Sequence, residues 1–194
     1  MKRGNRTAPP GAVRIVGGSL RGSRLAVPAL ADLRPTPQRL RETVFNWLMP
    51  VIEGARVLDL FAGSGALGIE ALSRGASHAL LVECDRAQAE RIGSDLARLH
   101  IANGEVRCAD ALQLLTLTPE RPFDIVFLDP PFDAGLWTRT AALLQQRGWL
   151  ADNARIYVET PLQPAFEPPT NWALHRQSRA GAVLGALYIC GAPP

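Results

Sequence analysis

Residues 123–132 join a buried strand to an acid and a rigid turn, a combination that could grip a flat ligand carrying hydrogen-bond donors. Ile125-Val-Phe-Leu128 is an apolar, β-branched run of the kind found in strands buried on both faces. Pro130-Pro131 must end this strand, because proline has no N–H and a fixed φ. Asp129 and an exposed Phe132 ring are therefore expected at the carboxyl end of the strand, where α/β sheets bind their ligands. A strand cap followed by a proline turn is the alternative without chemistry.

A glycine-rich turn follows an earlier apolar strand, and its spacing is that of a nucleotide-cofactor site. Gly63, Gly65 and Gly68 match G-x-G-x-x-G, in which glycine lets the backbone approach a ligand closely. Of the acids that follow the next two strands, Glu83 could accept hydrogen bonds from ribose hydroxyls and Asp110 from an adenine amine. The residues predicted to contact the cofactor are Asp59, Phe61, Gly63, Ser64, Gly65, Glu83, Cys84, Asp110 and Ala111.

The charge of this turn favours one cofactor, since the glycine pattern alone fits NAD, FAD and S-adenosylmethionine. Asp59 lies four residues before Gly63. Its carboxylate would oppose a pyrophosphate there, but it would suit the sulfonium and α-ammonium groups of S-adenosylmethionine. We therefore predict S-adenosylmethionine as the cofactor and S-adenosylhomocysteine as its product. Asp110 keeps a second interpretation, because an acid at that position can also cap a helix.

Short strands and helices alternate from Ala55 onward, which is the pattern of an α/β fold with a doubly wound parallel sheet. The last two predicted strands have no helix between them, so we expect an antiparallel hairpin at one sheet edge. In this fold the first and fourth strands of the sheet are neighbours, which would bring Gly63–Gly65 and Asp129 to one crevice. Strands are expected near residues 56–61, 79–83, 105–108, 123–129, 155–160, 172–177 and 183–190, and helices near 65–74, 86–100, 110–117 and 136–147.

The N-terminal part of the chain is strongly basic. Residues 1–41 hold nine basic residues and one acid, a net charge of +8, whereas the rest of the chain has a net charge of −5. A basic arm on an acidic body is typical of a protein that binds nucleic acid, although a solvated tail is the simpler alternative. The arginines predicted to contact RNA are Arg14, Arg21, Arg24, Arg34, Arg39 and Arg41.

Cysteine usage and hydropathy argue against several other classes of protein. The three cysteines are scattered without a C-x-x-C spacing and are not accompanied by histidines, so we predict neither a metal site nor a disulfide framework. The sequence contains no run of about 18 apolar residues that could span a membrane. Met1 is followed by charged and polar residues, so no signal peptide is expected.

Together the two candidate sites predict methyl transfer to an exocyclic amine of a nucleic-acid base. Such an amine is a weak nucleophile, because its lone pair is delocalised into the ring. Hydrogen bonds from the amine to the Asp129 carboxylate and the Pro130 carbonyl would orient the nitrogen, and Asp129 could take up the released proton. Phe132 would stack on the base once the base has left its helix or loop. Asp129, Pro130, Pro131 and Phe132 are therefore the predicted catalytic residues.

The sequence resembles the RsmD family from about residue 13 to residue 190, nearly the whole chain. Asp129-Pro-Pro-Phe132 is similar to the signature of amino-group methyltransferases that act on adenine, guanine, cytosine or glutamine. The wider set of shared motifs is Arg14-Ile-Val-Gly-Gly, Leu33-Arg-Pro-Thr36, Arg41-Glu-Thr-Val-Phe-Asn-Trp-Leu48, Leu58-Asp-Leu-Phe-Ala-Gly-Ser-Gly-Ala-Leu67, Glu70-Ala-Leu-Ser-Arg-Gly75 and Phe127-Leu-Asp-Pro-Pro-Phe132.

The resemblance implies a Rossmann-like class I methyltransferase that modifies N2 of one guanine in bacterial 16S rRNA, namely guanine 966. It implies a cytoplasmic enzyme acting on the small ribosomal subunit or an assembly intermediate, and we expect a monomer. We divide the chain into a disordered basic tail (1–11), an RNA-binding β-hairpin extension (12–32) and the methyltransferase domain (33–194).

Three other functions stay open at this point. An adenine-N6 methyltransferase acting on RNA or DNA would share every pocket motif. A dehydrogenase fits the glycines but leaves Asp129–Phe132 without a role. A non-catalytic RNA-binding assembly factor fits the basic arm, and it would lose nothing when Asp129 is replaced by alanine.

Overall fold

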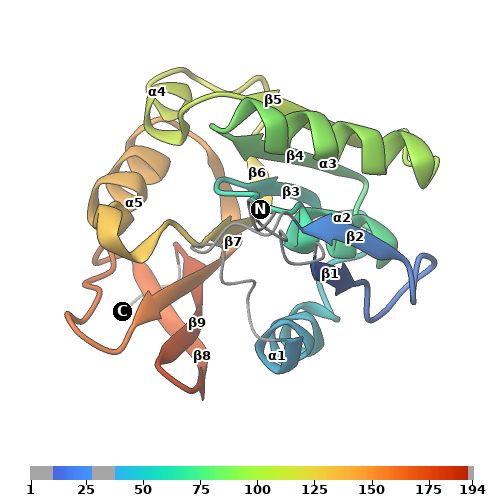
Figure 1. The fold of residues 1–194 in the computed structure, drawn as a ribbon. Helices are drawn as coiled ribbons and strands as arrows, with labels where there is room; N and C mark the ends of the chain where they lie inside the picture. The colour runs from blue at the N-terminus through green and yellow to red at the C-terminus, as the bar shows by residue number, and fades with distance from the viewer. Residues whose placement is uncertain (1–10, 28–37, 192–194) are drawn as a thin grey trace, which may run out of the picture.

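A seven-stranded sheet forms the centre of the computed structural model, which describes residues 11–27 and 38–191 (Figure 1). The strands lie in the order β5-β4-β3-β6-β7-β9-β8. The first five in this order are parallel, and β9 pairs antiparallel with both β7 and β8. The predicted doubly wound sheet with a C-terminal antiparallel hairpin is thus confirmed. The strands are β3 (Arg56–Asp59), β4 (His78–Glu83), β5 (Gly104–Cys108), β6 (Phe123–Leu128), β7 (Leu150–Pro161), β8 (Trp172–Ala180) and β9 (Val183–Cys190).

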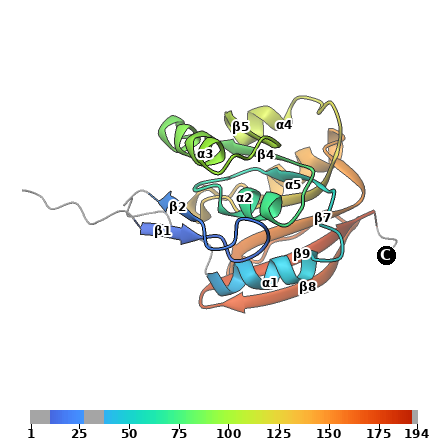
Figure 2. The same ribbon diagram turned by 90° about the vertical axis from the view of Figure 1, so that its right-hand side faces the viewer.

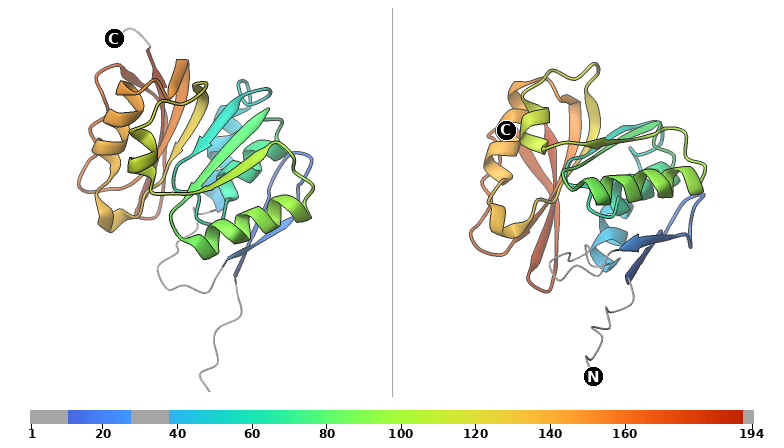
Figure 3. Two further views of the ribbon diagram at one scale, coloured as in Figure 1. Left: turned by 90° about the horizontal axis from the view of Figure 1, so that it is seen from above. Right: turned by 45° about the horizontal axis from the view of Figure 1, so that its top comes forward.

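Helices cover both faces of the sheet, which gives three layers (Figure 3). Side chains alternate between the faces along a strand, so Ile125 and Phe127 enter one core while Val126 and Leu128 enter the other. The first core is covered by α1 (Gln38–Leu48), α2 (Ala66–Ser73) and α3 (Arg86–Arg98), and the second by α4 (Ala111–Leu115) and α5 (Trp137–Gln146). Figure 2 shows α1 lying across the β9–β8 end of the sheet.

The sheet reverses its winding direction between β3 and β6. The chain goes from β3 outward through β4 to β5, and it then crosses back to place β6 on the other side of β3. Asp59 pairs in register with Leu81 of β4 and with Phe127 of β6. The carboxyl ends of these parallel strands therefore meet at one edge, at the switch point where such sheets bind ligands.

The predicted N-terminal hairpin is present, and it consists of β1 (Gly11–Arg14) and β2 (Arg24–Val27). Its two faces differ in the way that the alternating sequence requires. Val13, Ile15 and Leu25 are buried in the core beneath α1 and α2. This shared core, rather than the marginal stability of an isolated hairpin, holds the extension on the body.

Hydrogen bonds to the end of α2 fix the loop between the hairpin strands. The Glu70 carboxylate accepts a hydrogen bond from Val16 N at 2.8 Å, and the Ser73 carbonyl accepts one from Ser19 N at 2.7 Å. Gly18 has a φ of +74°, and a Cβ built on it would lie 1.8 Å from the Ser73 carbonyl oxygen, so no other residue fits there. Because α2 begins at the glycine-rich turn, the hairpin is attached to the same helix as the candidate cofactor site.

Several element boundaries differ from the sequence-based prediction. β8 extends to Ala180 rather than to about residue 177, and α3 and α4 end at Arg98 and Leu115 rather than near residues 100 and 117. β7 begins at Leu150 rather than near residue 155, because Leu150 pairs with Phe123 ahead of a register shift in β6. β3 ends at Asp59 rather than near residue 61. The basic tail up to residue 10 and Arg34, one of the arginines predicted to contact RNA, lie outside the described residues. Among the helices of the described segments, none is long and apolar enough to cross a membrane.

Candidate active site

Acidic side chains of four strands gather on one face at the carboxyl edge of the sheet. The register pairs Asp59 with Leu81, so Glu83 lies two residues further along β4 on the same face. Asp59 also pairs with Phe127, so Asp129 lies two residues beyond it on the side of β6 that faces α1 and α2. The next strand, β7, contributes Glu159 at the same level, because Val158 pairs with Leu128.

Glu83 holds the glycine-rich turn in place. One carboxylate oxygen accepts a hydrogen bond from Gly63 N at 2.8 Å, and the other accepts one from Asp85 N at 2.8 Å. Gly65 has a φ of +75°, and a Cβ built there would lie 3.2 Å from the side chains of Ile69 and Ile92. The turn is therefore shaped by the protein itself, and Glu83 supports it in addition to the ligand-binding role predicted from the sequence.

Asp59 is a buried carboxyl group beneath this turn. It is only 2% exposed, and its Oδ2 accepts a hydrogen bond from Gly68 N at 2.9 Å in the first turn of α2. Burial raises the pKa of Asp59 to about 7; the Gly68 bond opposes the rise, and nearby Glu83 adds to it. No cation of the described residues forms an ion pair with it. A positively charged ligand would stabilise its ionised form, so the donor set fits S-adenosylmethionine and disfavours a pyrophosphate.

Replacing Asp59 with asparagine is expected to stabilise the cofactor-free protein more at pH 8 than at pH 5. The folded-state pKa of about 7 lies above that of an unfolded aspartate. Asp59 therefore makes its full contribution to the free energy of unfolding only at acid pH, and this contribution is lost as the pH rises through about 7. Asparagine cannot ionise and escapes this loss, which amounts to about 1.4 kcal/mol per pKa unit. Thermal unfolding of both proteins at the two pH values measures the difference, and parallel pH profiles would contradict it.

The other predicted cofactor residues surround the same edge. Asp110 caps α4, and its Oδ1 accepts a hydrogen bond from Gln113 N at 2.8 Å, so its capping role is present beside any role toward a ligand. Ala111 is buried in the core, so only its backbone can take part in binding. Cys84 is exposed, while Phe61 and Ser64 are half-buried.

The Asp129–Phe132 turn is braced by a tryptophan. Asp129 and Phe132 are half-buried, Pro130 is buried, and Pro131 leads into a short 3₁₀ turn, η1 (Phe132–Ala134). The rings of Phe132 and Trp137 lie 5.7 Å apart between centroids. Trp137 Nε1 also donates a hydrogen bond to the Glu159 carbonyl at 2.7 Å. Trp137 thus connects the turn to the end of β7.

Sequence reasoning missed Glu159, although the signal that drew attention to Asp129 was present there too. Ile156-Tyr-Val-Glu159 is another apolar run that ends in an acid at the carboxyl end of a parallel strand. Glu159 is 2% exposed, and the Tyr157 hydroxyl donates a hydrogen bond to its Oε1 at 2.9 Å. Burial, together with the charge of Glu159 and then of Asp129, raises the pKa of Tyr157 well above its usual value.

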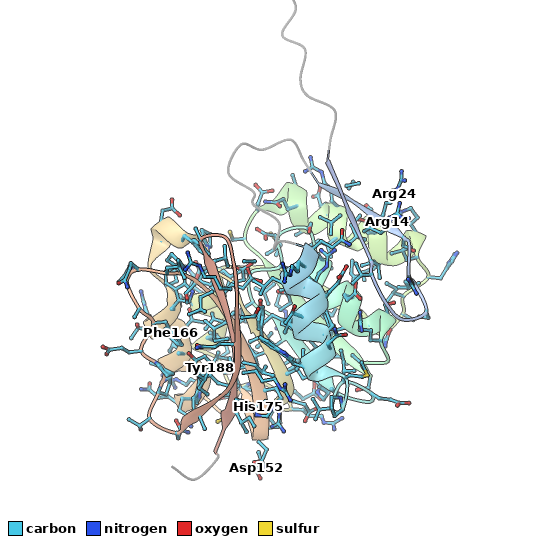
Figure 4. All side chains as sticks on the ribbon, turned by 90° about the horizontal axis from the view of Figure 1, so that it is seen from below. Arg14, Arg24, Asp152, Phe166, His175 and Tyr188 are labelled. Carbon is cyan, nitrogen blue, oxygen red and sulfur yellow. The ribbon has the colours of Figure 1, made fainter. Side chains whose placement is uncertain are left out.

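The arginines predicted to contact RNA fall into two groups. Arg14 and Arg24 are directly opposite each other across the hairpin, are exposed, and lie far from His175 of β8 (Figure 4). Like charges placed opposite each other destabilise a strand pair, and a bound anion would relieve this repulsion. Arg21 and Arg39 are exposed as well.

Arg41 has to be removed from the predicted set of RNA contacts. Its side chain is only 2% exposed, and its Nη2 donates a hydrogen bond to the Arg14 carbonyl at 2.6 Å. Burial lowers the pKa of Arg41, against the charges of Glu70, Glu42 and Glu159. Arg41 therefore fixes the hairpin from inside the protein, where RNA cannot reach it.

The described residues hold no group of three or more His, Cys, Asp and Glu side chains that could bind a metal ion. At this edge the chain places carboxylates, backbone carbonyls and aromatic rings. These groups are suited to binding a cation and an amine side by side.

Comparison with known proteins places this arrangement among the class I methyltransferases, whose fold the chain has. The family model described as conserved hypothetical protein 95 matches residues 13–189. The chain belongs to this family, the RsmD family. Ribosomal RNA small subunit methyltransferase D of Escherichia coli is 49% identical over 189 residues, which cover 97% of this chain and 94% of that protein.

Two further relatives support the assignment. Ribosomal RNA small subunit methyltransferase D of Haemophilus influenzae is 42% identical over 181 residues, covering 92% of this chain and 94% of that protein. The solved structure of the Escherichia coli protein YhhF superposes with a TM-score of 0.85 at 49% identity, covering 94% of this chain and 100% of that one. Both alignments extend over nearly the full chain.

Proposed function

We propose that this protein is an rRNA methyltransferase that transfers a methyl group from S-adenosylmethionine to the exocyclic N2 amine of a guanine in 16S rRNA. By family resemblance the target is guanine 966, and the substrate is the small ribosomal subunit or an assembly intermediate. We further propose that the enzyme is cytoplasmic and acts as a monomer. The observation that carries the proposal is the placement of Asp129 beside the Asp59–Gly65 turn at the switch point of the sheet.

The cofactor would be held by the glycine-rich turn and the acids around it. Gly63 and Gly65 allow close backbone approach, and Glu83 and Asp110 offer carboxylate acceptors to a ribose and an adenine. Asp59 supplies a negative charge beneath the turn. When bound there, S-adenosylmethionine would supply an electrophilic methyl group on a sulfonium.

The Asp129–Phe132 turn would prepare the amine. Asp129 accepts a hydrogen bond from one N–H and the Pro130 carbonyl accepts one from the other, which directs the nitrogen lone pair toward the methyl carbon. The Pro131 carbonyl is already bonded to Ala134 N at 3.1 Å. Methylation of the amine would release a proton, and Asp129 would accept it. Phe132, held by Trp137, gives the base a ring to stack on.

An adenine-N6 methyltransferase is the second candidate, because Asp129, Pro130 and Phe132 would treat any planar amine alike. The names of the relatives favour ribosomal RNA over DNA as the substrate class. The choice of guanine over adenine rests on the family resemblance.

Methylation of small subunits from a strain that lacks the gene tests the proposal. The purified protein and labelled S-adenosylmethionine are expected to modify one nucleotide of the 16S rRNA. Digestion to nucleosides followed by mass spectrometry should then give N2-methylguanosine. Recovery of N6-methyladenosine instead, or of label in DNA, would favour the second candidate.

A further inference from the structure

Glu159 and Asp129 occupy neighbouring positions on adjacent parallel strands. The last residue pair between β6 and β7 is Leu128 with Val158, and the next residue on each chain segment is one of the two acids. Their side chains lie on the same face of the sheet, since Phe127 and Tyr157, two residues earlier on each strand, pack in the same core with ring centroids 6.3 Å apart. Two carboxylates therefore lie side by side at the predicted base pocket.

The contacts of Glu159 keep it in place as a hydrogen-bond acceptor. Its Oε1 accepts a hydrogen bond from the Tyr157 hydroxyl at 2.9 Å, and its backbone carbonyl accepts one from Trp137 Nε1 at 2.7 Å. A carboxylate has about four acceptor positions, so a further donor can be bound beside Tyr157. Gly185 makes room for this arrangement, because a Cβ there would lie 2.5 Å from the Tyr157 hydroxyl oxygen.

A buried cation lies near Glu159. Arg41, 2% exposed, lies close enough for the charge of Glu159 to act on it. An acid that is buried at a ligand-binding edge, beside a hydroxyl donor and a cation, is suited to accept a hydrogen bond from a ligand.

The edges of the bases differ in what they place beside the amine. Guanine has two adjacent donors, its N2 amine and its N1–H group. Adenine has its N6 amine next to an N1 lone pair, and cytosine has its N4 amine next to an N3 lone pair. Two adjacent carboxylates match the two donors of guanine. They disfavour adenine and cytosine, because a buried carboxylate would then face the lone pair of a ring nitrogen.

We infer that Glu159 is the residue that selects guanine, by accepting a hydrogen bond from N1–H while Asp129 binds the neighbouring N2 amine. The inference rests on the proposed function, since it names the specificity determinant of the same site. It assigns Asp129 to the reacting amine and Glu159 to base identity, so the two roles can be separated experimentally.

The test uses RNA in which the target guanine is replaced by 2,6-diaminopurine. This base keeps the 2-amino group that would be methylated, but its N1 is an acceptor. The wild-type enzyme is expected to show a kcat/KM about 100-fold or more lower on this RNA than on the guanine RNA. In the variant Glu159→Gln, whose amide can donate to N1, the preference for guanine should shrink at least about tenfold.

Glu120→Gln is the matched control, because Glu120 is exposed and precedes β6 at the opposite edge of the sheet. It should keep the wild-type activity and preference. Cofactor binding and thermal unfolding show whether the Glu159→Gln variant is folded. If it is not folded, the activity of the wild-type enzyme on the two RNAs still tests the inference. Equal wild-type activity on both RNAs, or an equal loss on both in a folded Glu159→Gln variant, overturns the inference. Wild-type activity on an adenine RNA but not on the guanine RNA would instead refute the proposed function itself.

Discussion

Replacing Asp129 with alanine is expected to reduce kcat for methyl transfer by about 10²–10⁴-fold, the range typical of a residue that both positions a nucleophile and accepts its proton. The affinity for S-adenosylmethionine should change little, because the turn that would hold the cofactor is fixed by Glu83 and Asp59 rather than by Asp129. Single-turnover methylation of small subunits gives the rate, and calorimetry gives the cofactor Kd.

Two further variants separate the contributions of Asp129. Asp129→Asn keeps an acceptor for the amine but cannot take up the proton at neutral pH, so we expect it to lie between wild type and Asp129→Ala. Asp133→Ala is the matched control, since this exposed acid lies four residues further along in η1. Wild-type turnover by Asp129→Ala would rule out the assigned role. Loss of cofactor binding together with activity would place Asp129 in the cofactor site.

The parts of the fold that follow from local sequence could be predicted. Strand and helix alternation, the glycine-rich turn and the double proline each act over a few residues, and they gave the parallel sheet and the position of Asp129. The hairpin could be predicted for the same reason, because its apolar and basic residues alternate. The start of β7 could not, since Leu150 joins the strand by pairing across a register shift with Phe123, a partner distant in sequence.

The site was harder to predict where burial decides the role of a residue. Arg41 has the same sequence context as an exposed arginine, but packing of α1 on the hairpin buries it and directs it to the Arg14 carbonyl. Glu83 similarly holds the glycine-rich turn by accepting a hydrogen bond from Gly63 N. Only the folded structure reveals this contact. The neighbouring position of Glu159 depends on the strand order β3-β6-β7, which a single strand does not encode.

Reversing the charge of the hairpin pair, in Arg14→Glu combined with Arg24→Glu, is expected to raise the RNA Kd about 10–100-fold at physiological salt. It should also reduce the slope of log Kd against log salt by about 1 for each phosphate contact that is lost. The hairpin itself should be unaffected, because two glutamates repel each other as two arginines do. The Arg14 and Arg24 carbonyls would still bind Arg41 and Arg98.

Arg121→Glu combined with Arg147→Glu gives the matched control. These exposed arginines precede β6 and β7, at the edge of the sheet opposite the site, and they change the net charge by the same amount. If both double variants lose RNA affinity equally, the hairpin arginines act only through the overall charge of the protein. Substitution is a better test than deletion here, because removing the hairpin would also remove Val13, Ile15 and Leu25 from the core. A selective loss in the hairpin variant would show that the pair binds RNA, and its attachment to α2 would then connect RNA binding to the helix that begins at the cofactor turn.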